Sequence, residues 1–163
     1  MAAIDLKNAT IKIKDGTTPT PNELEITIGE GNLTYNEKIN IIYTKNRGAL
    51  DEVREGDEEP LEVNFDFVWE FLKANTGDDP SVEDVLKKRG EASGWVSTDA
   101  DACRPYAVDI EILYTPPCGG AYLEKIVFPD FRPEQLNHDL RNASVSVSGK
   151  CNVTEPTITR VAP

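Results

Sequence analysis

The feature that most constrains the fold is a run of alternating apolar and polar residues, LEVNFDFVWEFL, at positions 61–72. The apolar set occupies the odd positions and the polar set lies between them; the apolar residues are Leu61, Val63, Phe65, Phe67, Trp69 and Phe71. A period of two is the spacing of a strand with one buried face. A similar segment, LTYNEKINIIY, precedes it at 33–43. We therefore expect the two segments to pair as an amphipathic antiparallel hairpin.

Negative charge is concentrated on the same part of the chain. Between Asp51 and Asp84 there are thirteen acidic residues and two basic ones, so this segment carries −11 of the formal net charge of −12. A solvated face that keeps the protein soluble fits this pattern, and so does a surface that repels polyanions. Direct binding of nucleic acid is disfavoured, because phosphate contacts need clustered Lys and Arg.

The connection between the two expected strands, 44–60, is too long for a hairpin turn of two to five residues. Loops of this length without regular structure tend to be functional or mobile. Leu50 and Val53 are its only large apolar residues. We predict that they anchor the loop on the surface of a partner.

The rest of the chain is typical of one mainly β domain, which we place at 1–163. Further alternating segments lie at 4–14, 23–28, 106–114, 122–128 and 140–148, and an edge strand or extended arm is expected near the C-terminus. The prolines of PDFRPEQL, at 129–136, are expected to forbid regular pairing. We predict an antiparallel β-sandwich or barrel-like fold with one flanking helix.

The clearest helix signal covers about 80–89. Asp79 is the expected N-cap, Pro80 the first helical residue and Gly90 the residue that closes the helix. The three basic residues at 87–89 suit the negative end of the helix dipole, which explains the one basic cluster of the sequence.

The sequence offers little catalytic chemistry. It has one histidine, His138, no GxSxG elbow and no phosphate-cradling loop. A carboxylate pair for glycoside hydrolysis is conceivable, but coincidence is simpler on so acidic a face; the candidates are Asp109, Glu111 and Asp66. A calcium loop needs more oxygen ligands than the two that Asp99 and Asp101 supply. We expect no enzyme, no metal and no cofactor.

The three cysteines, Cys103, Cys118 and Cys151, match no zinc or redox spacing. Cys103 and Cys118 flank an expected strand and are too far apart to bridge. We expect reduced thiols, with a Cys118–Cys151 pair or a site shared with His138 as the alternatives. The first residues lack the apolar core of a signal peptide, and no apolar run approaches the ~20 residues of a membrane span. A soluble product of the cytoplasm is the expectation.

The run RGALDEVREGDEEPLEVNFDFVWEFL, at 47–72, resembles the corresponding block of the tail tube (major tail) proteins of long-tailed bacteriophages. The similarity continues through the helix, through PYAVDIEILYTPP at 105–117, and through KIVFPDFRPEQLNHDLRNASVSVSGKCNV at 125–153. It covers the chain from about Leu33 to Val153. The N-terminal third and the last ten residues match less clearly.

This resemblance implies a structural virion protein of the phage tail, assembled in the host cytoplasm. Six copies would form a ring, and rings would stack into a hollow tube through which DNA passes without specific binding. The implied partners are further copies of the chain, the tape measure protein and the terminator or distal tail proteins, with no membrane. The inner sheets of the six copies would join into one barrel.

The resemblance also assigns residues to this assembly. The 44–60 loop would contact the adjacent ring, with Arg54 alternatively pairing inside its own loop; the candidates are Arg47, Leu50, Asp51, Val53, Arg54, Glu55, Asp57 and Glu58. Acidic residues on the sheet would face the lumen and keep DNA phosphates from sticking; the candidates are Glu62, Asp66, Asp109 and Glu111.

Two other functions stay open at this point. One is another virion ring protein, either a tail terminator or a distal tail protein. The other is a free-standing β-sandwich binding module. A tube subunit predicts rings that polymerise, a terminator predicts rings that stop, and a binding module predicts a monomer.

Overall fold

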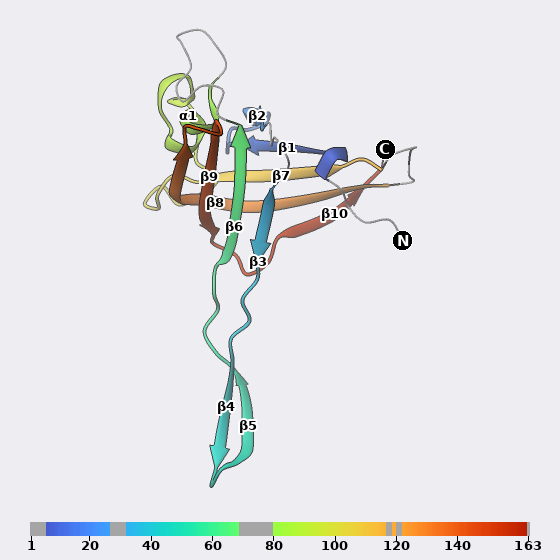
Figure 1. Cartoon of the computed structure of the whole chain (residues 1–163), viewed down its shortest axis with the longest axis vertical. Coiled ribbons are helices and arrows are strands. Elements are labelled where there is room, and N and C mark those ends of the chain that lie inside the picture. The colour runs from blue at the N-terminus through green and yellow to red at the C-terminus, as the bar shows by residue number, and fades with distance from the viewer. Residues whose placement is uncertain (1–5, 27–31, 69–79, 117–118, 120–121, 163) are drawn as a thin grey trace.

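The computed structural model describes residues 6–26, 32–68, 80–116, 119 and 122–162. Their strands form two crossed layers and one long arm that projects away from them (Figure 1). The strands are β1 (Ala9–Lys14), β2 (Glu23–Glu25), β3 (Leu33–Asn36), β4 (Ile41–Asn46), β5 (Ala49–Glu55), β6 (Leu61–Val68), β7 (Val108–Tyr114), β8 (Leu123–Asp139), β9 (Ser144–Cys151) and β10 (Thr157–Val161). The predicted mainly β, antiparallel fold with one α-helix is confirmed for the described residues.

All but two of these strands belong to one sheet, in the order β2-β1-β7-β8-β9-β6-β3, with β10 paired to β8. Strands β4 and β5 form a separate two-stranded sheet. Every pairing is antiparallel. Strand β10 pairs with β8 alone among the described strands, as expected for a C-terminal edge strand.

Strand β8 joins the two layers because it is long enough to serve in both. Its first half pairs with β7 and β10, and its second half pairs with β9. Phe131 stands at the change of partner, opposite Val108 of β7 and Cys151 of β9. Its buried ring lies against β9. A Cβ atom added to Gly149 of β9 would lie 2.6 Å from that ring. Glycine at 149 therefore lets β9 approach β8.

The expectation that prolines end the pairing at 129–136 is wrong. The ladder continues through both prolines and shifts register beside each of them. Next to Pro129, Asp130 adopts a left-handed conformation with φ 53°, and its backbone N–H donates to the Asp109 carboxylate instead of to the ladder. A bulge accommodates a residue that has no N–H to donate, so the strand bends without ending.

The core lies between the two layers. In β6 buried and less buried residues alternate, which confirms the predicted period of two over 61–68, whereas Trp69 and Phe71 lie outside the described residues. Phe65 of β6 packs on Phe131 of β8, with 5.9 Å between the ring centroids. The largest fully buried side chains include Phe65, Phe128, Phe131, Ile13, Leu61 and Ile110.

Helix α1 (Val82–Lys87) is present, but its predicted N-terminus is wrong. Ser81 is the N-cap, and its Oγ accepts a hydrogen bond from the Asp84 N–H at 3.2 Å. Pro80 therefore precedes the cap, and Asp79 lies outside the described residues. The helix ends at Lys88, which is left-handed with φ 51°, so Gly90 does not close it. Among the described helices none is long and apolar enough to cross a membrane.

Strands β3 and β6 pair antiparallel with Leu33 opposite Phe65, which confirms the expected hairpin. The expected first strand, 33–43, is however interrupted after Asn36, where the chain leaves the sheet. Residues 37–60, which we call the arm, run out from the body and back again (Figure 1). The arm contains β4 and β5, so the expected long irregular loop at 44–60 is instead most of a second hairpin.

Candidate assembly surface

The arm is a regular hairpin with a two-residue turn. Arg47 and Gly48 connect β4 to β5, with φ angles of 50° and 85°. Positive φ at both central residues is the geometry of a type I′ turn, which matches the right-handed twist of the flanking strands. Gly48, which readily adopts positive φ, was the available sequence signal for this turn.

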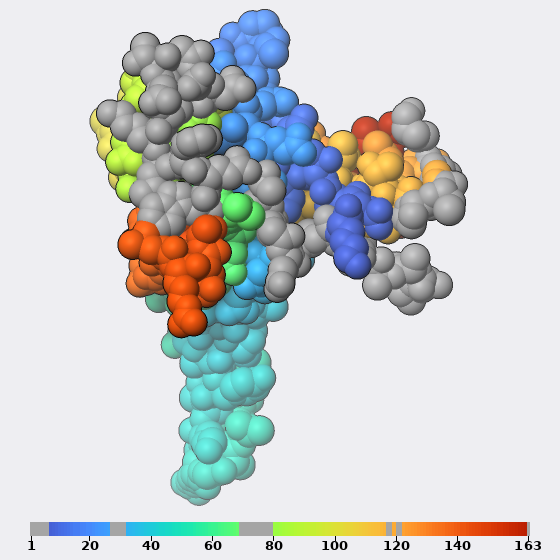
Figure 2. Space-filling view, turned by 45° about the horizontal axis from the view of Figure 1, so that its top comes forward, coloured from blue at the N-terminus to red at the C-terminus, as the bar shows by residue number. Residues whose placement is uncertain are grey.

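The arm has no packing partner within the described chain. Of residues 37–60, all but Ile42 and Gly56 are exposed. Large apolar side chains are among the exposed ones: Tyr43 is 60% exposed, Leu50 70%, Val53 61% and Ile39 81%. The space-filling view shows the arm standing clear of the body (Figure 2). An isolated two-stranded hairpin is marginally stable in water, so this one has the character of an element that is completed by a partner.

The cross-strand pairs give the arm an apolar centre. Tyr43 lies opposite Val53, and Lys45 lies opposite Leu50 beyond a register shift. Directly paired residues share a face, so Tyr43 and Val53 stand together on one side. The next pair along, Ile42 with Arg54, belongs to the other side. Ile39, Ile41 and Tyr43 are arm residues that the sequence analysis had assigned to a body strand.

All eight residues predicted for the 44–60 loop lie on the exposed arm. Arg47 is in the turn, five lie on β5, and two lie on the segment that returns to the body; these seven are Leu50, Asp51, Val53, Arg54, Glu55, Asp57 and Glu58. No ion pair in the described structure joins Arg54 to a carboxylate of the arm, so the alternative in which Arg54 pairs inside its own loop is not seen. Contact with another subunit stays a prediction.

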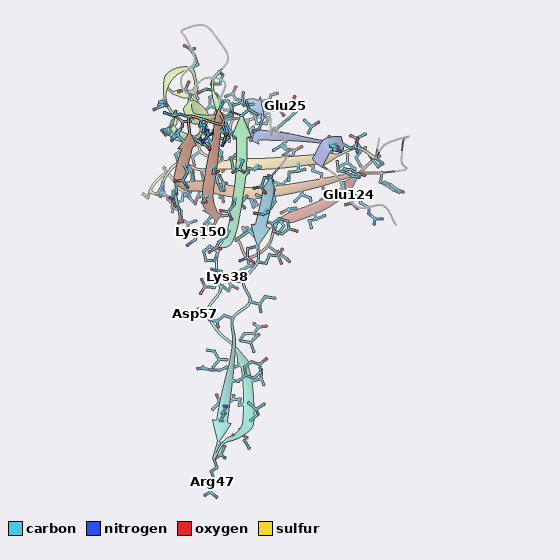
Figure 3. The ribbon with its side chains drawn as sticks, in the orientation of Figure 1. Glu25, Lys38, Arg47, Asp57, Glu124 and Lys150 are labelled. Carbon is cyan, nitrogen blue, oxygen red and sulfur yellow. The ribbon has the colours of Figure 1, made fainter. Side chains whose placement is uncertain are left out.

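Two interactions order the root of the arm, and one of them ties it to the body. The Gly56 N–H donates to the Asn40 carbonyl at 2.7 Å, which holds the outgoing and returning segments together. The Lys38 ammonium lies 2.8 Å from Oε1 of Glu62 on β6. Figure 3 shows Lys38, Asp57 and Lys150 at this root and Arg47 at the far tip. The hydrogen bond from Lys38 lowers the pKa of Glu62, and Glu62 raises the pKa of Lys38.

The four predicted lumen carboxylates divide between the two layers. Glu62 and Asp66 alternate with the buried residues of β6 and point away from the core. Asp109 and Glu111 do the same on β7, and β8 and β9 separate β7 from β6. Because the two layers enclose the core between them, the two pairs lie on outer faces of different layers. Which of them faces a lumen stays a prediction.

Their surroundings differ as well. Asn32 donates to Asp66 at 3.0 Å. Glu111 is held by Lys14 at 2.6 Å and by Lys125 at 3.6 Å. Asp109 has no cation in its described contacts, and burial raises its pKa, an effect that a hydrogen bond from the Asp130 N–H partly offsets. The negative charge of Glu111 is therefore balanced by nearby lysines, whereas ionising the Asp109 carboxyl costs free energy.

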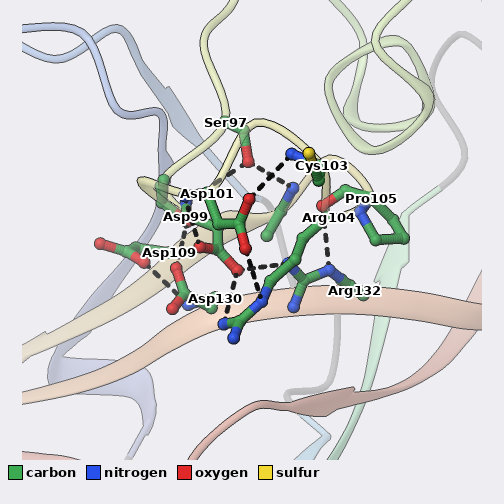
Figure 4. Close-up of polar contacts among 11 residues, drawn as sticks. Ser97, Asp99, Asp101, Cys103, Arg104, Pro105, Asp109, Asp130 and Arg132 are labelled. Atoms are coloured by element: carbon green, nitrogen blue, oxygen red, sulfur yellow. Dashed lines mark hydrogen bonds and ion pairs between the residues drawn. The ribbon is translucent and has the colours of Figure 1, made fainter.

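The acidic loop at 97–105 is fixed by arginines (Figure 4). Arg132 of β8 reaches Asp99 at 2.8 Å and also donates to the Pro105 carbonyl. Arg104 lies 3.5 Å from Asp99 and 3.4 Å from Asp101, and Asp101 accepts the Cys103 N–H. The described part of the chain contains no group of three or more His, Cys, Asp or Glu side chains placed to hold a metal ion. These two carboxylates organise the loop.

Two acids of α1 are buried rather than solvated. Asp84 is fully buried and lies 3.1 Å from the Arg89 Nε, and Glu83 lies 3.1 Å from the other end of the same guanidinium. Glu83 also contacts His138 at the far end of β8. The single histidine therefore links the helix to β8. Cys103 and Cys151 are free thiols, and Cys118 lies outside the described residues.

No protein-family model matches this chain, and no curated protein matches it in sequence. Solved structures do match in fold. A chain in the cryo-EM structure of the anti-feeding prophage cap, the AFP tube-terminating cap, superposes with a TM-score of 0.59 at 10% identity. The match covers 99% of this chain and 93% of that chain.

Two further matches come from an extracellular contractile injection system named PVC. The chain from its sheath/tube terminator in the extended state has a TM-score of 0.58 at 11% identity, over 99% of both chains. The chain from its sheath–tube complex in the extended state has a TM-score of 0.56 at 11% identity, over 99% of this chain and 93% of that one. Over 99% of its length, this chain therefore shares its fold with chains from a tube-terminating cap and from an extracellular contractile injection system.

Proposed function

We propose that this protein is a structural subunit of the tube part of a phage-tail-like particle, and that its copies work as a ring. The arm is the observation that carries this proposal. It exposes apolar side chains over a hairpin that no described residue of its own chain covers. The fold likeness to tube-related components supports it, because the likeness extends over 99% of the chain and thus includes the arm as well as the body.

The favoured place for this subunit is a terminator, the ring at which a tube ends. Two of the three compared structures are named for a tube terminator or terminating cap. This supports the terminator over the tube subunit that the sequence resemblance had put first. The tube subunit stays the second candidate, since the third structure is a sheath–tube complex with nearly the same TM-score.

In both cases we assign the arm the same task, which is to contact a neighbouring subunit through Tyr43, Leu50 and Val53. Association driven by apolar burial needs side chains that are exposed in the free subunit. The charged residues of the arm would then form the polar rim that limits docking to a matching partner. A ring of six copies and a lumen lined by carboxylates that repel DNA are further parts of the proposal, supported by the sequence resemblance.

Negative-stain electron microscopy with light scattering, over a range of protein concentrations, tests this proposal. Rings that remain single fit a terminator, and hollow tubes fit a tube subunit. Adding the protein to preformed tubes from the same particle separates the two further, because a terminator should bind only at tube ends. A protein that stays an 18.0 kDa monomer under all of these conditions would instead support the free-standing binding module.

A variant in which Ile41–Glu55 is replaced by a short Gly-containing turn removes the hairpin while leaving β3 and β6 intact. We expect it to fold and to lose assembly. A matched control is a triple serine substitution at exposed apolar positions of the body, Val96, Leu140 and Ile158, which lie off the arm. Assembly that survives removal of the hairpin would contradict the proposed task of the arm.

A further inference from the structure

The root of the arm sets the direction in which the arm points from the body. Two segments cross from body to arm, 37–40 outward and 56–60 back, and all of their residues are exposed except Gly56. Such segments have no core contacts to fix their direction. The direction must come from the few polar interactions at the root.

One of these interactions holds the two segments to each other. The Gly56 N–H donates to the Asn40 carbonyl at 2.7 Å. A Cβ atom on Gly56 would lie 2.7 Å from the Asn40 side chain, so glycine allows the segments to cross this closely. This contact fixes the segments relative to each other but does not join them to the sheet.

The other interaction does join the arm to the sheet. Glu62 belongs to β6 and lies in register with Asn36 on one side and Lys150 on the other. Its Oε1 lies 2.8 Å from the Lys38 ammonium, two residues beyond the end of β3. Glu62 therefore reaches from the rigid body to the first part of the arm. The other acid near Lys38, Glu59, has no hydrogen bond to it among the described contacts.

We propose that Glu62 is a positioning residue which, through Lys38, gives the arm a preferred direction, and that this ion pair is a releasable lock. An exposed ion pair of this kind changes the ratio of two populations by about 1.4- to 5-fold. That is enough to favour one direction and too little to prevent the arm from adapting to its partner. Glu62 thus has a structural task at the arm root, distinct from the lumen task that the sequence suggested.

The direction of the free arm does not depend on what the arm binds. Its use in docking rests on the proposed function. There, an arm that already points in the binding direction loses less conformational freedom on association. The two statements are therefore tested by different readouts, one on the free subunit and one on assembly.

Electron paramagnetic resonance on the monomer measures the direction. Spin labels at Thr44→Cys on the arm and Thr154→Cys on the body report their separation in a Cys103→Ser, Cys118→Ser background. Cys151 is buried, and burial raises its pKa to about 12, so it stays unlabelled. We expect one main distance in the parent. In Lys38→Met and Glu62→Gln the ratio of that population to the others should fall by about 1.4- to 5-fold.

Glu59→Gln is the matched control, since it removes a carboxylate near Lys38 without removing the hydrogen bond, and Lys38→Arg preserves the pair. Both should keep the parent distribution. An unchanged distribution in Lys38→Met, or an equal broadening in Glu59→Gln, would overturn the lock. A lock confirmed in the monomer without any change in the assembly threshold would overturn its docking use. A parent that never assembles would count against the proposed function instead.

Discussion

The body and the arm are built from the same kind of sequence and end in opposite environments. Strand β6 of the body alternates apolar and polar residues and buries every second one. Strands β4 and β5 of the arm also contain apolar residues at cross-strand positions, yet Tyr43 is 60% exposed and Val53 61%. Alternation therefore indicates a strand face suited to burial, and that face can be buried by the same chain or by another molecule.

The largest expected effect is in the body, at the place where both layers meet. Phe131→Ala removes a fully buried ring that packs on Phe65 and lies opposite both β7 and β9. We expect a loss of about 3–5 kcal/mol in the free energy of unfolding, because the cavity would be lined from both layers. Urea unfolding followed by circular dichroism measures it. A loss below about 1 kcal/mol would mean that the layers are not packed through this residue.

A matched pair of valines compares the two regions directly. Val63 of β6 is fully buried and Val53 of β5 is 61% exposed. Val63→Ala should cost about 1.5–3 kcal/mol of unfolding free energy, whereas Val53→Ala should stay within about 0.5 kcal/mol. The protein concentration needed for assembly should rise more for Val53→Ala than for Val63→Ala, when the two variants are compared at equal folded fractions. Equal stability losses would show that the arm folds back on the body in solution.

A smaller effect is expected at the arm turn. Gly48 has φ 85°, so Gly48→Ala should cost the hairpin about 1 kcal/mol. Because the arm does not pack on the body, the loss should be local: faster amide exchange in β4 and β5 and an unchanged midpoint of global unfolding. Gly94→Ala, at a glycine whose added Cβ meets open space, is the control. A drop in the global midpoint with Gly48→Ala alone would contradict the independence of the arm.

The smallest effect concerns Asp109 and depends on pH. Burial raises its pKa above the ordinary 3.8, so the stability that its protonated form contributes is present below that value and is lost as pH rises through the raised pKa. Asp109→Asn removes this loss, and its stability relative to the parent should therefore rise over that pH range and then level off. Urea unfolding at pH 3 to 7 measures the trend. Glu111→Gln, which loses two lysine contacts, should show no such gain.

The fold was largely predictable because its signals are local. Alternation placed the ends of β6, β7 and β1 within about five residues, and the predicted helix start, Pro80, lies two residues before the observed one. The prolines of β8 led to a wrong prediction of where the strand ends. The strand continues through a bulge in which the Asp130 N–H donates to Asp109, and Asp109 is distant in sequence. The arm was also predicted wrongly, although its signal is local. Its length suggested an irregular loop, whereas the Arg47–Gly48 turn could have indicated a hairpin.

The candidate site was predictable in part. Leu50 and Val53 were picked out as the only large apolar residues of the 44–60 connection, and both are exposed on the arm, while their contact with a partner stays a prediction. Tyr43 was expected on the strand at 33–43, because nothing in its neighbourhood distinguishes a strand that stays in the sheet from one that leaves it. The contact of His138 with Glu83 joins positions far apart in the sequence, and no local pattern indicates it.

By itself the sequence determined the period of each strand, the composition of its two faces and the concentration of acid at 51–84, since these are properties of neighbouring residues. Tertiary structure decided which faces are covered, where the long strand β8 changes partner, and that Glu62 meets Lys38 while Glu83 and Asp84 are buried around Arg89. These outcomes depend on contacts between distant segments, whose energies no local pattern contains.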